Sequence, residues 1–288
     1  MEIPNTALGL YTVAKTTKLD ANRTRAYASG INDTNEAFFD EGRPQGLKIH
    51  PGIGFSLQWN SRFRPDHKLP SHLERLSVHA ETDLRIVRPF KAEESITTQG
   101  QLVYQKQIKP GVFCVDRYRM TDQEGNLVAE LDYNGIIRGA SLTEPAREVR
   151  PIVERPQWVG QAQKPVWVEE IFIPEDAGQK YTDGANIYNP IHTEPNVAKA
   201  VGLPGIILHG SATKAIALSQ VIDRCFDREP DRVTRLYGQL RGMVLMSSRV
   251  RVQCMGVNDR NGMRSVLFEV FNEQGEKAIT HGVVEGRI

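Results

Sequence analysis

Hydrophobic and β-branched residues gather in short runs along the chain, and these runs predict strands. In the first half the predicted strands lie at 84–87, 96–104, 112–120 and 127–137. In the second half they lie at 238–245, 249–255, 264–271 and 277–284. Turn residues at 122–126 and 258–262 separate neighbouring runs, so the strands are expected to pair as antiparallel hairpins.

A segment with helical character precedes each set of strands. A short one lies near 52–59, and a longer helix is predicted from about Ser211 to Asp223. Residues recur every three or four positions along the longer helix, at Ala212, Ala215, Ile216, Ser219 and Ile222. Small residues on this stripe allow a helix to lie close against a curved sheet. One helix followed by four or five antiparallel strands, occurring twice, predicts an α+β fold of two similar units.

Weak internal repetition supports this division. Residues 27–35 share Tyr, Gly, Asn and Asn with residues 181–189, at an offset of 154. His50-Pro51-Gly52 then stands where His209-Gly210 stands in the second half. The stretch 144–165 is charged and rich in proline, as linkers are. We therefore predict an N-terminal unit at 1–143, a linker at 144–165 and a C-terminal unit at 166–288.

Composition narrows the function classes. The chain has 288 residues, enough for a large core, and a net charge of +1 that favours neither nucleic acid nor a membrane surface as partner. Three cysteines without metal-ligand spacing fit a reducing compartment. The first residues lack the basic start and apolar core of a secretory signal, and no apolar run approaches the ~18 residues of a membrane span. A cytoplasmic protein is expected.

Candidate chemistry concentrates at Asn189-Pro190-Ile191-His192. Proline restricts the residue before it, so Asn189 is expected to be extended. A histidine can exchange a proton near neutral pH, and an asparagine can hold a water molecule without competing for its proton. A helix is expected after Thr193, with Glu194 and Pro195 in its cap and first turn. Gly210, at the start of the longer helix, can offer a backbone N–H to a developing oxyanion.

These residues resemble the MaoC-like, or hydratase-2, family of (R)-specific enoyl-CoA hydratases and dehydratases. The segments that carry the resemblance are 189–194 and 207–210. The resemblance implies a double hotdog fold, in which each unit is a helix wrapped by an antiparallel sheet, and a homodimer. It further implies that His192 and Asn189 are catalytic and that Gly210 is the oxyanion donor.

One departure from the family bears on the reaction. The catalytic aspartate of the family lies two residues before the asparagine, where this chain has Ile187. Asn186 is the nearest polar substitute, and Glu194 or Asp183 could replace the lost base. The residues implied to bind substrate are Tyr181, Asn186, Ile187, Tyr188, Ile191, Glu194 and His209. Direct chemistry and a purely orienting role are both open for His209.

The first half also departs from the family motif, but at a different position from the second half. It has Asp33 at the aspartate position but Phe38 at the histidine position. The resemblance implies that the second half performs the chemistry while the first holds the acyl chain. Asp33 is then expected to cap its turn through Asn35. A composite site of Asp33 and His192 would require the two loops to meet.

The predicted reaction is addition or removal of water at the α,β double bond of an acyl thioester, carried by coenzyme A or an acyl carrier. No cofactor and no metal are expected beyond the thioester itself. Because the aspartate is missing, isomerisation, cyclisation, thioester hydrolysis and a non-catalytic thioester-binding role remain alternatives. Basic residues that could meet the phosphates of coenzyme A are Arg62, Arg64, Lys68, Arg241, Arg249 and Arg251. His79 has no partner in the sequence and is expected to be a surface or strand residue.

Overall fold

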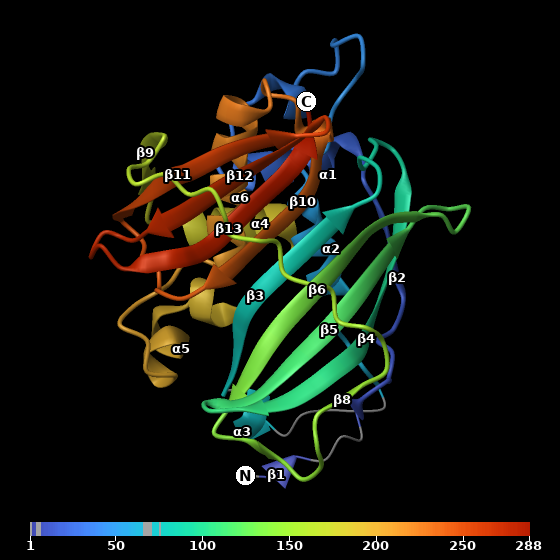
Figure 1. The fold of residues 1–288 in the computed structure, drawn as a ribbon, viewed down its shortest axis with the longest axis vertical. Coiled ribbons are helices and arrows are strands. Elements are labelled where there is room, and N and C mark those ends of the chain that lie inside the picture. The colour runs from blue at the N-terminus through green and yellow to red at the C-terminus, as the bar shows by residue number, and fades with distance from the viewer. Residues whose placement is uncertain (1, 4–6, 66–70, 75) are drawn as a thin grey trace.

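A computed structural model describes residues 2–3, 7–65, 71–74 and 76–288. Its main feature is an eleven-stranded sheet that curves around helices on one of its faces (Figure 1). Every pairing within this sheet is antiparallel. The α+β fold class and the antiparallel hairpins predicted from the sequence are therefore confirmed.

The strands of the two halves occupy equivalent places in the sheet. The first half contributes β2 (Lys15–Lys18), β3 (Ser77–Ile86), β4 (Ser95–Ile108), β5 (Gly111–Thr121) and β6 (Leu127–Arg138). The second contributes β9 (Trp167–Ile173), β10 (Val233–Leu240), β11 (Ser248–Arg260), β12 (Met263–Phe271) and β13 (Lys277–Arg287). The spatial order is β2-β4-β5-β6-β3-β10-β13-β12-β11-β9, so the second half repeats the first in reverse from the seam. Three two-residue strands complete the set, namely β1 (Glu2–Ile3), β7 (Ser141–Leu142) and β8 (Arg147–Glu148).

The helices also follow one order in both halves. Those of the first half are α1 (Ala21–Gly30), η2 (Glu36–Phe38), α2 (Ile53–Asn60) and α3 (Ser71–Glu74). Those of the second half are α4 (Ala177–Ala185), η3 (Pro190–His192), α5 (Pro195–Ala200), α6 (Gly210–Cys225) and η4 (Pro230–Arg232). The helices predicted near 52–59 and from about Ser211 correspond to α2 and α6, and most of α6 is buried beneath the sheet.

Helices α1 and α4 were not predicted, and they pack against each other. Helices α1 and α4 make close contact across the two halves. Gly30 and Gly184 allow this approach, because a Cβ added to Gly184 would lie 2.2 Å from the carbonyl oxygen of Ala26. The segment from Tyr181 to Ala185, which is part of the internal repeat, is helical.

One strand assignment was wrong at its C-terminal end. The run predicted at 238–245 leaves the sheet after Leu240, and β10 begins earlier, at Val233. Beyond Leu240 the chain pairs instead with the segment before α6, where the N–H of Leu208 donates to the carbonyl of Val244 over 2.8 Å. The N–H groups of Arg241 and Gly242 still donate to β13, over 2.9 and 2.8 Å, and the pairing with Leu208 places the residues after them beside the start of α6.

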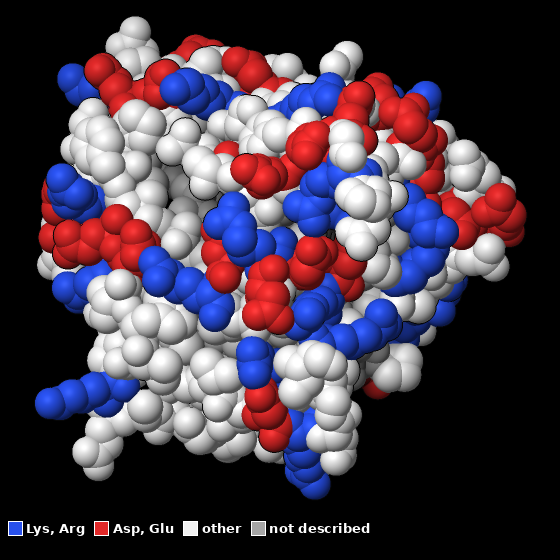
Figure 2. Space-filling model, turned by 90° about the horizontal axis from the view of Figure 1, so that it is seen from above, with Lys and Arg blue, Asp and Glu red and all other residues white. Residues whose placement is uncertain are grey.

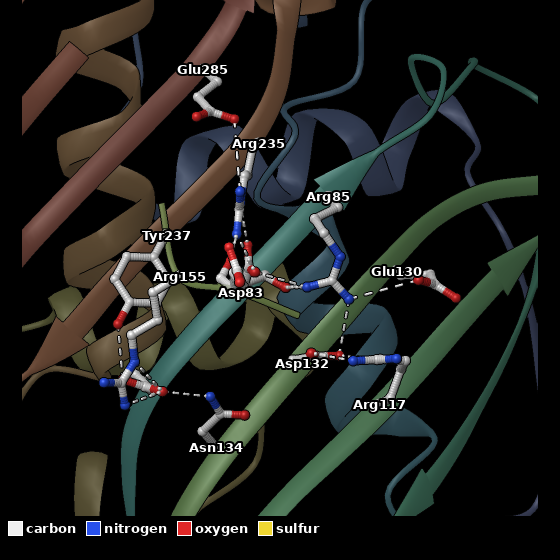
Figure 3. Close-up of polar contacts among 12 residues, drawn as sticks. Asp83, Arg85, Arg117, Glu130, Asp132, Asn134, Arg155, Arg235, Tyr237 and Glu285 are labelled. Atoms are coloured by element: carbon white, nitrogen blue, oxygen red, sulfur yellow. Dashed lines mark hydrogen bonds and ion pairs between the residues drawn. The ribbon is translucent and has the colours of Figure 1, made fainter. Parts of the chain in front are cut away.

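The halves join edge to edge through β3 and β10. Asp83 on β3 accepts a two-pronged pair of hydrogen bonds from Arg235 on β10, at 2.9 and 2.8 Å. It also accepts a bond of 2.9 Å from Arg85, which extends the network to Asp132 and Arg117 on the neighbouring strands (Figure 3). This outer-face network holds the two sheets in register.

The stretch predicted as a linker crosses the outer face of the sheet (Figure 1). Apart from β8 it forms no helix or strand between Glu144 and Pro165. Arg155 from this stretch donates to Glu81 on β3 over 3.0 Å, and Arg235 donates to the carbonyl of Glu154 over 2.8 Å. These contacts hold the stretch against the seam.

The surface carries both charges. Figure 2 shows Lys and Arg interleaved with Asp and Glu on one face, as the small net charge leads one to expect. Within the described ranges, no helix has both the length and the apolar character needed to cross a membrane.

Candidate active site

A cavity of about 650 Å³ lies between the two halves and contains the predicted catalytic residues. The second half lines it with Asn189, His192 and Gly210, together with Ile187, Ile191 and His209. The first half contributes residues of α2, β3 and β6, among them Phe55, Trp59 and Tyr133. The second half therefore supplies polar groups capable of chemistry, while the first half supplies both large aromatic and polar side chains.

His192 is held in one tautomer. Its Nδ1 lies 2.8 Å from the carbonyl oxygen of Ile207, which can only accept, so Nδ1 carries the hydrogen. The Nε2 atom is left with its lone pair available. Burial lowers the pKa of His192 to about 4, and the hydrogen bond to Ile207 acts in the opposite direction. At neutral pH the ring is therefore an uncharged base.

His209 supports the ring of His192. The two rings stack with centroids 3.7 Å apart, and the ring of Tyr181 meets His209 edge-on at 5.0 Å. His209 Nε2 lies 3.3 Å from the carbonyl oxygen of Ile187. The pKa of His209 is lowered to about 3, first by burial and then by the neighbouring His192. These contacts favour the orienting role over direct chemistry.

Asn189 and Gly210 complete the reactive wall. Asn189 is extended, with φ −141° and ψ 113°, as the following proline predicted, and its amide forms no capping hydrogen bond. The expected helix after it is α5, with Glu194 at its N-cap. Gly210 is the first residue of α6, where a backbone N–H has no partner within the helix. The wall thus offers an amide, a neutral imidazole and a helix N-terminus.

Four of the predicted substrate-binding residues do not line the cavity. Tyr181 is buried behind His209, and Tyr188 is 61% exposed to solvent. Glu194 faces solvent at the start of α5. Asn186 adopts a left-handed conformation, with φ 53°, as the C-cap of α4. We do not propose direct substrate contact for these four residues.

No carboxylate replaces the missing aspartate at this wall. Ile187 itself lines the cavity and is 4% exposed, so the suggestion that Asn186 takes the aspartate position is wrong. The helical cap turns Asn186 away, because its backbone closes the last turn of α4. Asp183 is exposed and accepts a hydrogen bond from Gln179. With Glu194 also outside, His192 has no carboxylate partner among the residues that line the cavity.

Asp33 belongs to a separate, smaller cavity. That cavity measures about 80 Å³ and lies between α1, β9 and α6, where it is also lined by Ser219 and Asp223. Asp33 accepts a hydrogen bond of 2.7 Å from the N–H of Asn35, as expected of a residue that caps its turn. Burial raises its pKa. Asp33 and His192 therefore do not share a cavity, and we discard the composite site.

The residues of the first half that are equivalent to His192, His209 and Gly210 lack the reactive groups. His50 occupies the place of His209, and Phe38 packs edge-on against it at 5.3 Å, where the second half has His192. Pro51 stands in the place of Gly210 and has no N–H to offer an oxyanion. Both the base and the oxyanion donor are thus missing from the first half.

Sequence reasoning missed a polar patch on the first-half wall. His79 and Thr82 of β3 line the cavity, and His79 Nε2 lies 2.6 Å from Thr82 Oγ1. His79 is a strand residue, as expected, but its ring also stacks on Tyr133 at 4.1 Å. The strand brings it to the cavity through long-range pairing, which the local sequence does not indicate.

The basic candidates lie in different surroundings. Arg241 lines the cavity and is exposed, as is Arg138 of β6. Arg64 forms an ion pair with Asp116, and Lys68 lies outside the described residues. In the part of the chain that the structure describes, no group of three or more His, Cys, Asp or Glu side chains is placed to hold a metal ion.

Comparison with known families assigns both halves. Residues 159–278 match the MaoC like domain, and residues 7–131 match the FAS1-like, dehydratase domain region. The chain therefore carries a MaoC-like dehydratase domain in its second half and a FAS1-like dehydratase region in its first. Each of these matches covers less than half of the chain.

Similar sequences include two named relatives. The chain is 28% identical to the fatty acid synthase subunit beta of Schizosaccharomyces pombe over 40% of this chain and 6% of that protein. It is 24% identical to the peroxisomal enoyl-CoA hydratase 2 of Arabidopsis thaliana over 74% of this chain and 69% of that protein. The match thus spans only a small part of the synthase subunit.

Solved structures show the same fold. A MaoC-like dehydratase from Phytophthora capsici superposes with a TM-score of 0.84 at 18% identity, covering 99% of this chain and 98% of that one. A Mycobacterium tuberculosis protein described as having a double hotdog fold gives a TM-score of 0.66 at 13% identity, covering 98% and 97%. The tandem hotdog arrangement is therefore confirmed.

Proposed function

We propose that the protein adds water to, or removes water from, the α,β double bond of an acyl thioester. The observation that carries this proposal is the cavity in which the uncharged His192, the free amide of Asn189 and the first N–H of α6 meet. The MaoC-like domain at 159–278 and the similarity to an enoyl-CoA hydratase support the same reaction class.

The groups divide the work of hydration as follows. The N–H of Gly210 polarises the thioester carbonyl, and Asn189 holds the water molecule near C3. His192 Nε2 takes a proton as the water oxygen bonds to C3 and the π electrons move to the carbonyl oxygen. The imidazolium then returns that proton to C2, and the enolate reverts to the thioester. Dehydration is the reverse, and His192 serves as both base and acid.

The first half holds the acyl chain in this proposal. Phe55, Trp59 and Tyr133 are aromatic residues of the first half that line the same cavity as His192. The exposed Arg138 and Arg241 lie at the margin of the cavity, one from each half, where they can meet the phosphates of a coenzyme A carrier. The degenerate corner of the first half, with Phe38 and Pro51, supports this division of labour.

The first prediction concerns pH. As a base, His192 must be uncharged, so kcat/KM is expected to fall as the pH drops through a folded-state pKa of about 4 and to stay level between pH 5.5 and 8. A pH–rate profile of the wild-type protein on an enoyl thioester measures this. An acidic limb near pH 6.5, the ordinary histidine value, would show that burial does not set the pKa of the base.

The second prediction concerns a variant that restores the missing carboxylate. Ile187→Asp is expected to raise kcat/KM for crotonyl-thioester hydration by at least about tenfold, because a general base contributes about 10²–10⁴ in rate. The negative charge should also raise the pKa of His192 and move the acidic limb upward. Ile187→Asn is the matched control, with the same shape and no charge, and should give neither effect.

The activity of the Ile187→Asp variant also distinguishes hydration from the alternative reactions. If Ile187→Asp folds and gains no activity, the chain is adapted to a different reaction on thioesters, such as isomerisation or cyclisation. A wild-type kcat well above ~10 s⁻¹ on simple enoyl thioesters would mean that Ile187 does not limit the reaction.

The function itself is tested by following the enoyl-thioester chromophore. Loss of its absorbance over a panel of acyl chain lengths, dependent on His192, is the expected result. If no enoyl thioester of any length is consumed, and no 3-hydroxyacyl thioester is dehydrated, the proposed function is wrong.

A further inference from the structure

A buried lysine lies directly behind the first-half wall of the cavity. Lys214 lies on α6, one turn after Gly210, and its side chain is fully buried, at 0% exposure. Its Nζ donates to Thr82 Oγ1 over 2.6 Å, and Thr82 in turn lies 2.6 Å from His79 Nε2. Thr82 and His79 both line the cavity. The ammonium is thus separated from the cavity by a single hydroxyl group.

Lys214 has no counter-charge of its own. Adjacent residues of a strand point to opposite faces, so Glu81 lies on the outer face while Thr82 points inward. The carboxylate of Glu81 is already bonded to Arg155, Tyr237 and Asn134. Among the described residues, Lys214 takes part in no ion pair and donates only to Thr82. A buried cation without a partner is costly.

The pKa of Lys214 reflects the lack of a paired carboxylate. Burial lowers the pKa of Lys214 to about 7, and the distant charge of Glu81 offsets this only in part. The other charged side chains at the seam pair with one another, as Asp83 does with Arg235 and Arg85. An anion in the cavity would therefore supply the one charge that Lys214 lacks.

A plain hydrocarbon chain would suit the apolar part of the first-half wall but would form no hydrogen bond with the polar patch of His79 and Thr82. Phe55, Trp59 and Tyr133 offer apolar surface, and His79 stacks on Tyr133 with its Nε2 turned to Thr82. A methyl-terminated chain would cover the hydroxyl of Thr82 without accepting a hydrogen bond from it. With the hydrogen of His79 on Nε2, Thr82 Oγ1 accepts from both His79 and Lys214, so its own hydrogen is free for a carboxylate. That carboxylate would lie one hydroxyl away from the ammonium of Lys214.

We propose that the acyl chain of the substrate carries a carboxylate, and that Thr82, oriented by His79 and backed by Lys214, binds it. This inference rests on the proposed function, because the thioester end of the substrate is placed at His192 and Gly210. The substrate class is then a monothioester of a dicarboxylic acid. Thr82 determines specificity, His79 is a positioning residue, and Lys214 acts through Thr82 as a positioning and charge-bearing residue.

Binding of unreactive thioesters tests the inference. Saturated coenzyme A thioesters with four to eight acyl carbons are prepared in two series, one ending in a methyl group and one in a carboxylate. Calorimetry on the wild-type protein should give a Kd at least about tenfold lower for the carboxylated member at one or more lengths. Equal affinities at every length would overturn the proposal.

Three variants locate the effect. Lys214→Met should abolish the preference while leaving the Kd of the methyl-terminated series within about threefold of the wild-type value. Thr82→Val keeps the shape of the side chain but removes its hydroxyl, and it should also lose the preference. Lys180→Met is the matched control, because Lys180 is an exposed lysine in an ion pair with Asp176. Its preference should be unchanged.

The outcomes stay distinct from those of the hydratase assay. Saturated thioesters cannot be hydrated, so a carboxylate preference without any turnover would refute the reaction and leave this inference standing. Turnover of enoyl thioesters without a carboxylate preference would do the opposite. If Lys214→Met fails to fold, Thr82→Val decides, and retention of the preference in that variant would overturn the proposal.

Discussion

Replacing His192 with alanine is expected to lower kcat about 10²–10⁴-fold on any enoyl thioester that the wild-type protein hydrates, the usual cost of a lost general base. The reason is structural. His192 is the cavity residue whose Nδ1 hydrogen is fixed on the carbonyl of Ile207, which leaves Nε2 free to move the proton. Steady-state kinetics of the purified variant measure the loss, and thermal unfolding checks that the fold is retained.

Asp33→Asn and Asn189→Ala complete this comparison. Asp33 lies in the smaller cavity and bonds the N–H of Asn35, so its variant should keep kcat within a few-fold of the wild-type value. Asn189→Ala should lose activity, because the amide that places the water is gone. If Asp33→Asn loses as much activity as His192→Ala, the assignment of the chemistry to the second half is wrong.

Replacing Asp83 with alanine is expected to destabilise the protein by about 3–5 kcal/mol, because it leaves two half-buried arginines without their shared partner. Asp83 is 4% exposed and bonds Arg235 across the seam and Arg85 on its own strand (Figure 3). For a chain of this size, the loss corresponds to a decrease in Tm of roughly 5–15 °C. Calorimetry or circular dichroism on heating measures it.

The matched control is Asp259→Ala. Asp259 also receives two hydrogen bonds from one arginine, Arg264, at 2.7 and 2.6 Å, but the pair lies at an exposed hairpin. Exposed pairs contribute little, so the Tm of this variant should change only slightly. Equal decreases in Tm for the two variants would show that the seam network is not what joins the halves.

The main elements of the fold could be predicted because their signals are local. The stripe of small residues gave α6, and turn residues at 122–126 and 258–262 gave the hairpins. Helices α1 and α4 escaped prediction because their stability comes from each other. Their glycines, Gly30 and Gly184, allow a contact between segments 154 positions apart, and a local pattern carries no sign of it.

The same distinction applies to the site. The order Asn189-Pro190-Ile191-His192 and the later His209-Gly210 were visible as spacing, and all of these residues except Pro190 line one cavity. The helical cap at Asn186 was not visible, so the sequence left Asn186 open as a polar substitute for the aspartate. His79, Thr82 and Lys214 come from β3 and α6, and only the pairing of the two halves brings them together.

Hydration in isotopically labelled water tests the central claim most directly. An enoyl thioester is incubated with the protein in water enriched in oxygen-18, and the products are analysed by mass spectrometry while free thiol is measured in the same sample. The account predicts an intact 3-hydroxyacyl thioester with one labelled oxygen at C3, no release of thiol, and no such product with His192→Ala. Release of the thiol with a labelled free acid, or recovery of the unchanged enoyl thioester, would contradict it.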